Sequence, residues 1–203
     1  WQKRFQMEIE AENYPIAVMG AGTMGRGIAQ AAASAGHPLM LYDVAEKHTQ
    51  DAIEYIGQRL EESLQKGKIT ENSKVQILNN IKPVYVLDEL FQAKLIIEAV
   101  IEDLKIKQEL FCRLESVLEA DSILSTNTSS LDLNKIGTNL KRPERFVGMH
   151  FFNPVPVMAL VEIIHTAETD PRVTEFVFQL AKKWGKVPVH VRNSPGFIVN
   201  RAA

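Results

Sequence analysis

A glycine-rich turn near the amino terminus constrains this chain more than any other feature. The run Gly20–Gly25, with the sequence GAGTMG, directly follows a short apolar run, Ile16–Met19, and leads into a stretch rich in alanine, methionine and isoleucine. This context predicts a buried parallel strand, a tight turn and a helix. Gly20 then permits the turn, Gly22 lets a pyrophosphate approach the backbone, and Gly25 lets helix and strand pack closely. Free N–H groups and the helix dipole would face the anion.

A carboxylate follows the second predicted strand. The apolar run 38–42 ends at Asp43, 18 residues beyond Gly25. A carboxylate at this place accepts hydrogen bonds from the hydroxyls of an adenosine ribose, and it repels the additional phosphate of NADP. No arginine follows it immediately, although Lys47 is near. We therefore expect NAD as the cofactor; the alternative is a glycine turn with an unrelated surface aspartate.

Apolar runs alternate with amphipathic stretches through the rest of the chain. Further strands are predicted at 84–87, 95–100, 122–125, 145–151, 159–165 and 187–191. This alternation predicts an α/β fold with a doubly wound, mostly parallel sheet of the Rossmann type. Two helices, at 45–66 and 70–80, form an excursion of about 35 residues after the second strand, more than a βαβ crossover needs. We read it as a long helical insertion.

Length and composition limit the possible classes. The 203 residues suit one α/β domain, or one domain with a fragment of a second. We expect an extension or linker at 1–14, the NAD-binding domain at 15–192, and the beginning of a truncated helical domain at 193–203. A net charge of −2 does not indicate a nucleic-acid partner.

The sequence gives few indications of a membrane segment, a metal site or a compartment. No apolar run reaches the roughly 18 residues that a membrane-spanning helix needs, and we expect neither a membrane partner nor a metal site. The single cysteine fits a reducing compartment. We expect the cytoplasm, with an organelle matrix as the alternative.

A histidine and a glutamate are predicted to meet across two later strands. His150 ends one strand, a proline-containing connection follows it, and Glu162 lies in the next strand. If the strands pair antiparallel around a turn near Pro156, the two side chains oppose each other, about 5 Å apart at Cβ. Such a pair suits a base that takes an alcohol proton as hydride leaves carbon. The alternative is a partly buried histidine satisfied by its neighbour.

Two other polar clusters follow strands at the same edge of the sheet. The run 125–130, STNTSS, is dense in short donors and acceptors, and Glu102 with Lys107 follows the fourth strand. Ligands bind at the carboxyl edge of open α/β sheets, so both clusters are candidates. The alternatives are a capping run for a helix near Leu131 and a solvated charged face.

Together these residues resemble the 3-hydroxyacyl-CoA dehydrogenase family over about residues 15–203. The resemblance rests on five stretches in order: GAGTMG at 20–25, EAVIE at 98–102, NTSSL at 127–131, HFFNPVP at 150–156 and SPGFIVNR at 194–201. It implies NAD-dependent, reversible oxidation of L-3-hydroxyacyl-CoA to 3-oxoacyl-CoA, as in fatty-acid β-oxidation or short-chain acyl-CoA metabolism.

The resemblance also implies roles for particular residues. His150 would be the catalytic base, Glu162 its electrostatic partner, and Ser129 and Asn200 the donors to the 3-oxygen of the substrate. Cofactor-binding residues would be Gly20, Gly22, Thr23, Met24, Gly25, Asp43, Glu102, Lys107 and Asn127. Candidates for the phosphates of CoA on the helical insertion are Arg59, Lys66 and Lys68.

One departure from the family leaves alternatives open. Members have a helical C-terminal domain after the Pro-Gly-Phe segment, which completes the acyl pocket and usually forms the dimer; here it is only begun. The expected partners are an acyl-CoA substrate and either a second copy, through that missing domain, or other domains of a multifunctional polypeptide. The alternatives to an active enzyme are an NAD-binding module without activity alone and a related dehydrogenase of a free hydroxy acid.

Overall fold

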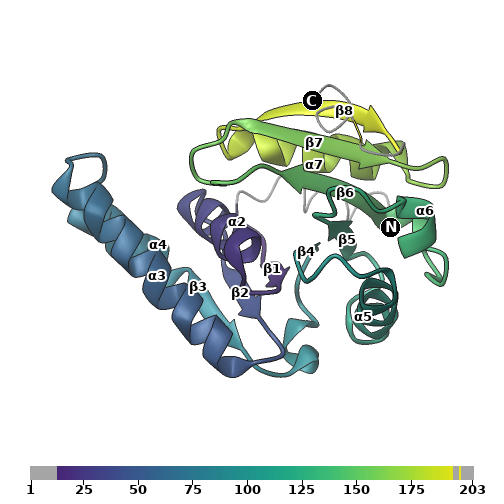
Figure 1. Cartoon of the computed structure of the whole chain (residues 1–203), viewed down its shortest axis with the longest axis horizontal. Coiled ribbons are helices and arrows are strands. Elements are labelled where there is room, and N and C mark those ends of the chain that lie inside the picture. Colours follow the sequence, from purple (N-terminus) through teal and green to yellow (C-terminus); the bar gives the residue numbers. More distant parts are fainter. Residues whose placement is uncertain (1–12, 194–196, 198–203) are drawn as a thin grey trace.

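The computed structural model describes residues 13–193 and residue 197. Within these residues, eight strands form a single sheet with the order β3-β2-β1-β4-β5-β6-β7-β8 (Figure 1). The strands are β1 (Ile16–Met19), β2 (Leu39–Tyr42), β3 (Ile81–Val84), β4 (Leu95–Glu98), β5 (Ile123–Thr126), β6 (Phe146–Phe151), β7 (Leu160–His165) and β8 (Val187–Arg192). The pair β6–β7 is antiparallel and the other neighbours are parallel. The predicted doubly wound, mostly parallel sheet is confirmed.

Helices cover both faces of the sheet. They are α2 (Thr23–Ser34), α3 (Glu46–Gln65), α4 (Glu71–Asn79), α5 (Leu104–Val117), α6 (Leu133–Ile136) and α7 (Pro171–Lys183). One hydrophobic cluster joins the sheet to α2, α3, α4 and α7, and a second joins it to α5 and α6. All residues of β1, β4 and β5 are buried, as expected for parallel strands covered on both sides.

The strand order fixes where a ligand can bind. Strand β1 lies between β2 and β4, so the connections that leave β1 and β4 run in opposite directions. A crevice opens at such a reversal, outside the carboxyl ends of the strands. The glycine turn follows β1 directly at this point.

The third strand lies three residues earlier than predicted. The sequence suggested 84–87, but β3 spans Ile81–Val84 and a 3₁₀ helix, η1, occupies Leu87–Leu90. Pro83 lies within this strand. Because β3 is the edge strand and pairs with β2 alone, a proline is tolerated in it.

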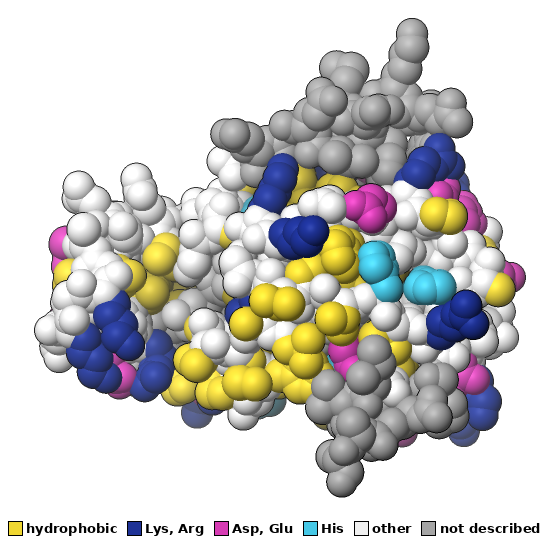
Figure 2. All heavy atoms as spheres, turned by 90° about the horizontal axis from the view of Figure 1, so that it is seen from above, with side chains coloured by type: hydrophobic (Ala, Val, Ile, Leu, Met, Phe, Trp, Pro, Cys, Tyr) yellow, Lys and Arg dark blue, Asp and Glu magenta, His cyan; other side chains and the backbone are white. Residues whose placement is uncertain are grey.

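The helical insertion is confirmed and forms an arm. Thr70 caps α4, since its Oγ1 accepts a hydrogen bond from the Ser73 N–H at 3.1 Å. Lys74 of α4 reaches Glu61 of α3, with 2.6 Å between Nζ and Oε2. Figure 1 shows the α3–α4 arm projecting beyond the sheet, and Figure 2 shows lysine and arginine side chains gathered near its outer end.

Most of the predicted terminal segments, 1–14 and 193–203, lie outside the described residues. In the part of the chain that the structure describes, no helix is long and apolar enough to cross a membrane.

Candidate active site

The three glycines of the turn meet different surroundings. Gly20 has a φ of +97°, and a Cβ atom there would lie 2.7 Å from the Ala99 carbonyl oxygen. A Cβ atom on Gly25 would lie 1.7 Å from the Gly20 carbonyl oxygen. Both positions therefore need glycine for the turn itself. A Cβ atom on Gly22 would meet nothing within 4 Å, so this residue borders open space.

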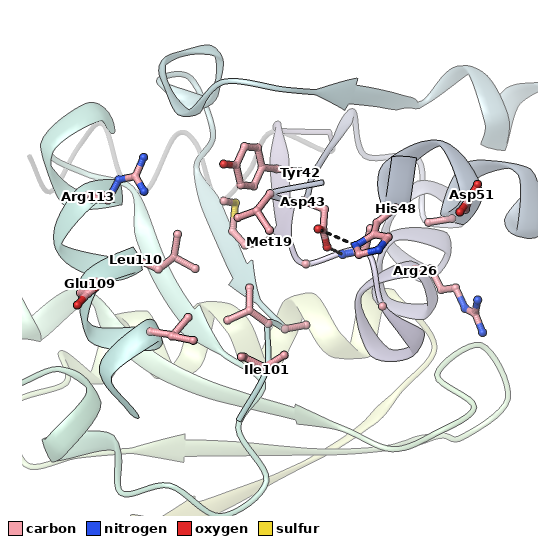
Figure 3. A pocket seen from close by; sticks show the side chains of 18 residues that line it. Met19, Arg26, Tyr42, Asp43, His48, Asp51, Ile101, Glu109, Leu110 and Arg113 are labelled. Carbon is pink, nitrogen blue, oxygen red and sulfur yellow. Dashed lines mark hydrogen bonds and ion pairs between the residues drawn. The ribbon is translucent and has the colours of Figure 1, made fainter. Parts of the chain in front are cut away.

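The amino end of α2 is arranged to hold an anion. Gly22 is its N-cap residue, and no side chain caps the free N–H groups of the first turn. A pocket of about 680 Å³ opens beside this end and is lined by Gly20, Gly22 and Asp43, among others (Figure 3). The open space at Gly22 and the uncapped helix end fit the pyrophosphate of a dinucleotide. Thr23, predicted to bind it, is the first residue of this helix.

Asp43 is tied to the glycine turn. Its Oδ2 accepts a hydrogen bond from the Ala21 N–H at 2.8 Å, and its Oδ1 accepts one from the Ala45 N–H at 3.1 Å. His48 Nδ1 lies 3.1 Å from the same Oδ1, the contact dashed in Figure 3. Burial acts to raise the pKa of this carboxyl, but the hydrogen bonds and His48 outweigh it and hold the pKa below its ordinary value. Asp43 thus faces the pocket as a carboxylate, as a ribose site requires.

The predicted histidine–glutamate contact is present. His150 pairs with Glu162 in the antiparallel register of β6 and β7, and Nδ1 lies 2.7 Å from Oε2. The side chain of Glu162 is 1% exposed and that of His150 is 8% exposed. Because Nδ1 is engaged by the carboxylate, Nε2 is the ring nitrogen left for a substrate.

A second pocket, of about 360 Å³, lies in front of His150. Its lining includes Met24, Asn127 and Ser129, all predicted site residues. Ala99 and Val100 line both this pocket and the one at the glycine turn. The two pockets are therefore neighbours along the carboxyl edge of the sheet. A single dinucleotide can extend from Asp43 past the turn toward His150.

The polar run 125–130 at the end of β5 is held by hydrogen bonds to Glu102, after β4, and to Phe151 of β6. Glu102 Oε1 accepts hydrogen bonds from the Thr128 hydroxyl at 2.5 Å and from the Ser129 N–H at 2.9 Å. Asn127 Oδ1 accepts one from the Phe151 N–H at 2.9 Å, which ties the run to the strand of His150. The alternative of a capping run is also partly met: Thr128 Oγ1 accepts a hydrogen bond from the Leu131 N–H at 3.0 Å, although the N-cap of the next helix, α6, is Asp132.

Lys107 differs from the expectation of a cofactor-facing residue. Its side chain is 1% exposed, and Nζ lies 2.5 Å from Glu98 Oε1 and 3.2 Å from Glu102 Oε2. Lys107 lines neither pocket, whereas Glu102 lines the one at His150. Sequence reasoning missed Glu98 as a site residue. The available signal was a charged residue at the end of an apolar strand.

The connection between β6 and β7 packs against α2, the helix that begins at the glycine turn. Val155 packs on Gly27 of α2, where an added Cβ atom would lie 3.0 Å from the Val155 Cβ. The buried Lys186 donates from Nζ to the carbonyl oxygens of Val155 and Met158, at 2.5 and 2.9 Å. These contacts hold the hairpin of His150 at a set position relative to the glycine turn.

Some predicted residues do not reach the pockets. Arg59, Lys66 and Lys68 are exposed on the arm and line neither pocket, and Arg59 pairs with Glu62 at 2.6 Å. Asn200 lies outside the described residues. The structure adds lining residues of the larger pocket that no motif marked: Arg26, Val44, Ile106, Leu110 and Arg113. Among residues 13–193 and 197, no cluster of potential ligands is arranged to hold a metal ion.

The fold and the site together define a dinucleotide-binding domain of the Rossmann type, with a buried histidine–glutamate pair in a pocket at the carboxyl edge of its sheet. The model of the family "3-hydroxyacyl-CoA dehydrogenase, NAD binding domain" matches residues 15–194, and the chain belongs to this family.

Relatives and solved structures agree with this assignment. The chain is 44% identical over 188 residues to a 3-hydroxyadipyl-CoA dehydrogenase of Escherichia coli K12, covering 93% of this chain and 40% of the relative. It is 42% identical over 186 residues to a 3-hydroxybutyryl-CoA dehydrogenase of Clostridioides difficile, covering 92% and 66%. The crystal structure of a 3-hydroxybutyryl-CoA dehydrogenase from E. coli K12 superposes with a TM-score of 0.92 at 43% identity, covering 94% of this chain and 40% of that one.

The chain thus spans between two fifths and two thirds of the length of these relatives. It is also 38% identical to a fatty acid oxidation complex subunit alpha of Ectopseudomonas oleovorans, of which it covers 27%. Domains of this kind therefore occur in polypeptides of very different lengths.

Proposed function

We propose that this chain is the NAD-binding part of an enzyme that oxidises the 3-hydroxyl group of an L-3-hydroxyacyl-CoA to a 3-oxo group, reversibly. The observation that carries the proposal is the buried contact of 2.7 Å between His150 and Glu162 in a pocket adjoining the glycine turn. The names of the relatives support the thioester class of substrate.

His150 acts as the base in this proposal. Its Nε2 accepts the hydroxyl proton of the substrate while hydride leaves the same carbon, and in the reverse direction it returns that proton. Glu162 holds the ring by Nδ1 and compensates the positive charge that the ring acquires. NAD, when bound, would supply the hydride acceptor beside His150.

Other residues position the reactants. Ser129 lines the His150 pocket, and both its N–H and its hydroxyl donate to Glu102 Oε1, at 2.9 and 3.4 Å. Turned toward the substrate, the hydroxyl would donate to the 3-oxygen instead. Asn200 keeps the same predicted role. Gly22 and the amino end of α2 receive the pyrophosphate, and Asp43 receives the adenosine ribose. Asn127 and Glu102 serve the nicotinamide side.

The arm is the proposed site for the CoA phosphates. Arg59, Lys66 and Lys68 supply positive charge on its exposed surface, away from both pockets. Replacing Lys66 and Lys68 with alanine should raise the KM for the CoA ester several-fold and leave the KM for NAD unchanged. Equal kinetics for acetoacetyl-CoA and free acetoacetate would instead favour a dehydrogenase of free hydroxy acids.

The direct test follows NADH absorbance with acetoacetyl-CoA, using this chain and a longer polypeptide that contains it. Turnover in the longer form, lost in His150→Gln, supports the enzyme. Calorimetry with NAD and with acetoacetyl-CoA shows whether the 203-residue chain alone is a binding module. Dimerisation through a following domain and a cytoplasmic location stay predictions. Size-exclusion chromatography of the longer form and fractionation of the source cells test them.

A further inference from the structure

Three ionisable side chains meet where β4 ends and α5 begins. Glu98 is fully buried, Lys107 is 1% exposed, and Glu102 lies between them and the pocket of His150. Lys107 Nζ lies 2.5 Å from Glu98 Oε1, 3.2 Å from Glu102 Oε2 and 3.5 Å from the Val100 carbonyl oxygen.

Glu98 accepts hydrogen bonds from every group that it meets. Oε1 accepts from Lys107 and from the Val100 N–H at 2.8 Å, and Oε2 accepts from the Thr126 hydroxyl at 2.7 Å. Burial raises the pKa of the Glu98 carboxyl, while the ammonium and the three hydrogen bonds oppose this rise. An environment made only of donors suits the ionised form.

The cluster therefore has an excess of negative charge. Two carboxylates share one ammonium, and the shorter contact belongs to Glu98 rather than to Glu102. Glu102 is also the exposed member, with 37% of its side chain accessible, and it lines the pocket in front of His150. Of the described residues that line this pocket, only Glu102 and His150 are ionisable. Glu162 adds a second carboxylate behind the His150 ring.

This arrangement matters because the two redox forms of the cofactor differ in charge. The nicotinamide ring is cationic in NAD⁺ and neutral in NADH. A fixed negative charge a few ångströms from the ring, in a partly dry site, distinguishes the two forms. If Lys107 paired with Glu102 alone, its charge would cancel that of Glu102 and the distinction would weaken.

We infer that Glu98 is a positioning residue that sets the charge of the site. By pairing with Lys107, it leaves the negative charge of Glu102 uncompensated beside the nicotinamide, which raises the affinity for NAD⁺ relative to that for NADH. The inference rests on the proposed function only in placing the nicotinamide in the His150 pocket. Glu98 touches neither cofactor nor substrate and acts through Lys107 and Glu102.

The test is the ratio of NAD⁺ affinity to NADH affinity, measured without turnover. Glu98→Gln keeps the size of the side chain and removes its charge, so that Lys107 pairs with Glu102. Calorimetry with NAD⁺ and fluorescence titration with NADH should show the ratio falling about five- to tenfold, mainly through weaker NAD⁺ binding. Glu102→Gln should lower the ratio at least as much. Glu175→Gln, on the exposed face of α7, makes the same change in net charge far from the pocket and should leave the ratio unchanged.

A thermal melt of each variant separates a charge effect from a folding defect. If Glu98→Gln does not fold, Glu102→Gln carries the test alone, because that side chain is partly exposed. A folded Glu98→Gln that binds both nucleotides with an unchanged ratio overturns the inference and leaves the proposed function intact. A wild-type chain that binds neither nucleotide overturns both. Equal losses of affinity for NAD⁺ and NADH in Glu98→Gln would show a purely structural role for Glu98 and would also overturn the inference.

Discussion

The glycine turn and the proton-transfer hairpin lie on one edge of the same sheet, yet they are built by different means. The turn is fixed by backbone atoms: Gly20 and Gly25 have no room for a Cβ atom. The hairpin is fixed by side chains, namely the His150–Glu162 contact and the Lys186 hydrogen bonds to the connecting loop. The turn is therefore specified by close backbone contacts, of Gly25 with Gly20 and of Gly20 with Ala99, whereas the hairpin depends on strand register and on side chains from distant parts of the chain. Mutations should separate binding from chemistry along this division.

The largest expected effect lies in the hairpin. His150→Gln removes the base while keeping a polar side chain of similar reach, so kcat should fall by about three orders of magnitude. The Kd for NAD should stay within about twofold, because the glycine turn is untouched. Steady-state kinetics in a polypeptide that turns over acetoacetyl-CoA, together with calorimetry, measure both. A variant that retains most of its kcat would remove His150 from the mechanism.

The second prediction contrasts two glycines of the turn. Gly25→Ala places a Cβ atom against the Gly20 carbonyl and should lower the free energy of unfolding by about 3 kcal/mol. Gly22→Ala has space for its methyl group and should change the unfolding free energy by less than about 0.5 kcal/mol. It should nevertheless weaken NAD binding about tenfold, because the methyl group occupies the approach of the pyrophosphate. Chemical denaturation and calorimetry test the pair; equal stability losses would contradict the assigned geometry.

Glu162→Gln tests the support of the base. The amide still reaches His150 Nδ1 but no longer compensates the charge on the ring, so kcat should fall about 100-fold with little change in KM. A loss as large as that of His150→Gln would point instead to a collapsed hairpin. Near-ultraviolet circular dichroism of the variant, compared with the wild type, shows whether the fold has been kept.

The smallest expected effect concerns Asp43 and pH. Its pKa is lowered in the folded chain, so it stabilises the fold above the unfolded pKa of about 3.9, and that contribution is lost as pH falls through the folded value. At pH 7, Asp43→Asn should cost about 1 kcal/mol, a value limited by solvent screening. The difference from wild type should shrink below about pH 4. Urea denaturation across pH 3–7 measures it, and a constant difference would mean that Asp43 stabilises without its charge.

The same division explains what could be predicted from the sequence. The glycine turn and Asp43 were found because their physics is local: an apolar strand, a turn without side chains and a second strand ending in a carboxylate. The His150–Glu162 contact was also predictable, because a turn centred near Pro156 sets the two residues opposite each other on antiparallel strands. β3 was misplaced by three residues, because the local apolar pattern does not show which residues pair with β2.

Contacts between charged side chains were harder to predict from the sequence. The Glu98–Lys107 contact joins residues nine positions apart across a strand end and a helix, and its geometry exists only once both are packed. The family resemblance assigned Lys107 to the cofactor, which stays a prediction; in the structure its ammonium contacts Glu98 and Glu102. The contact of His48 with Asp43 could not be predicted either, because nothing in the sequence around His48 indicates it.

The most direct measurement is a crystal structure of this chain with bound NAD. The account predicts the pyrophosphate within about 3 Å of the N–H groups at the start of α2 and the nicotinamide in the pocket formed by Glu102, Asn127 and His150. A dinucleotide bound elsewhere, or one whose nicotinamide points away from His150, would contradict it.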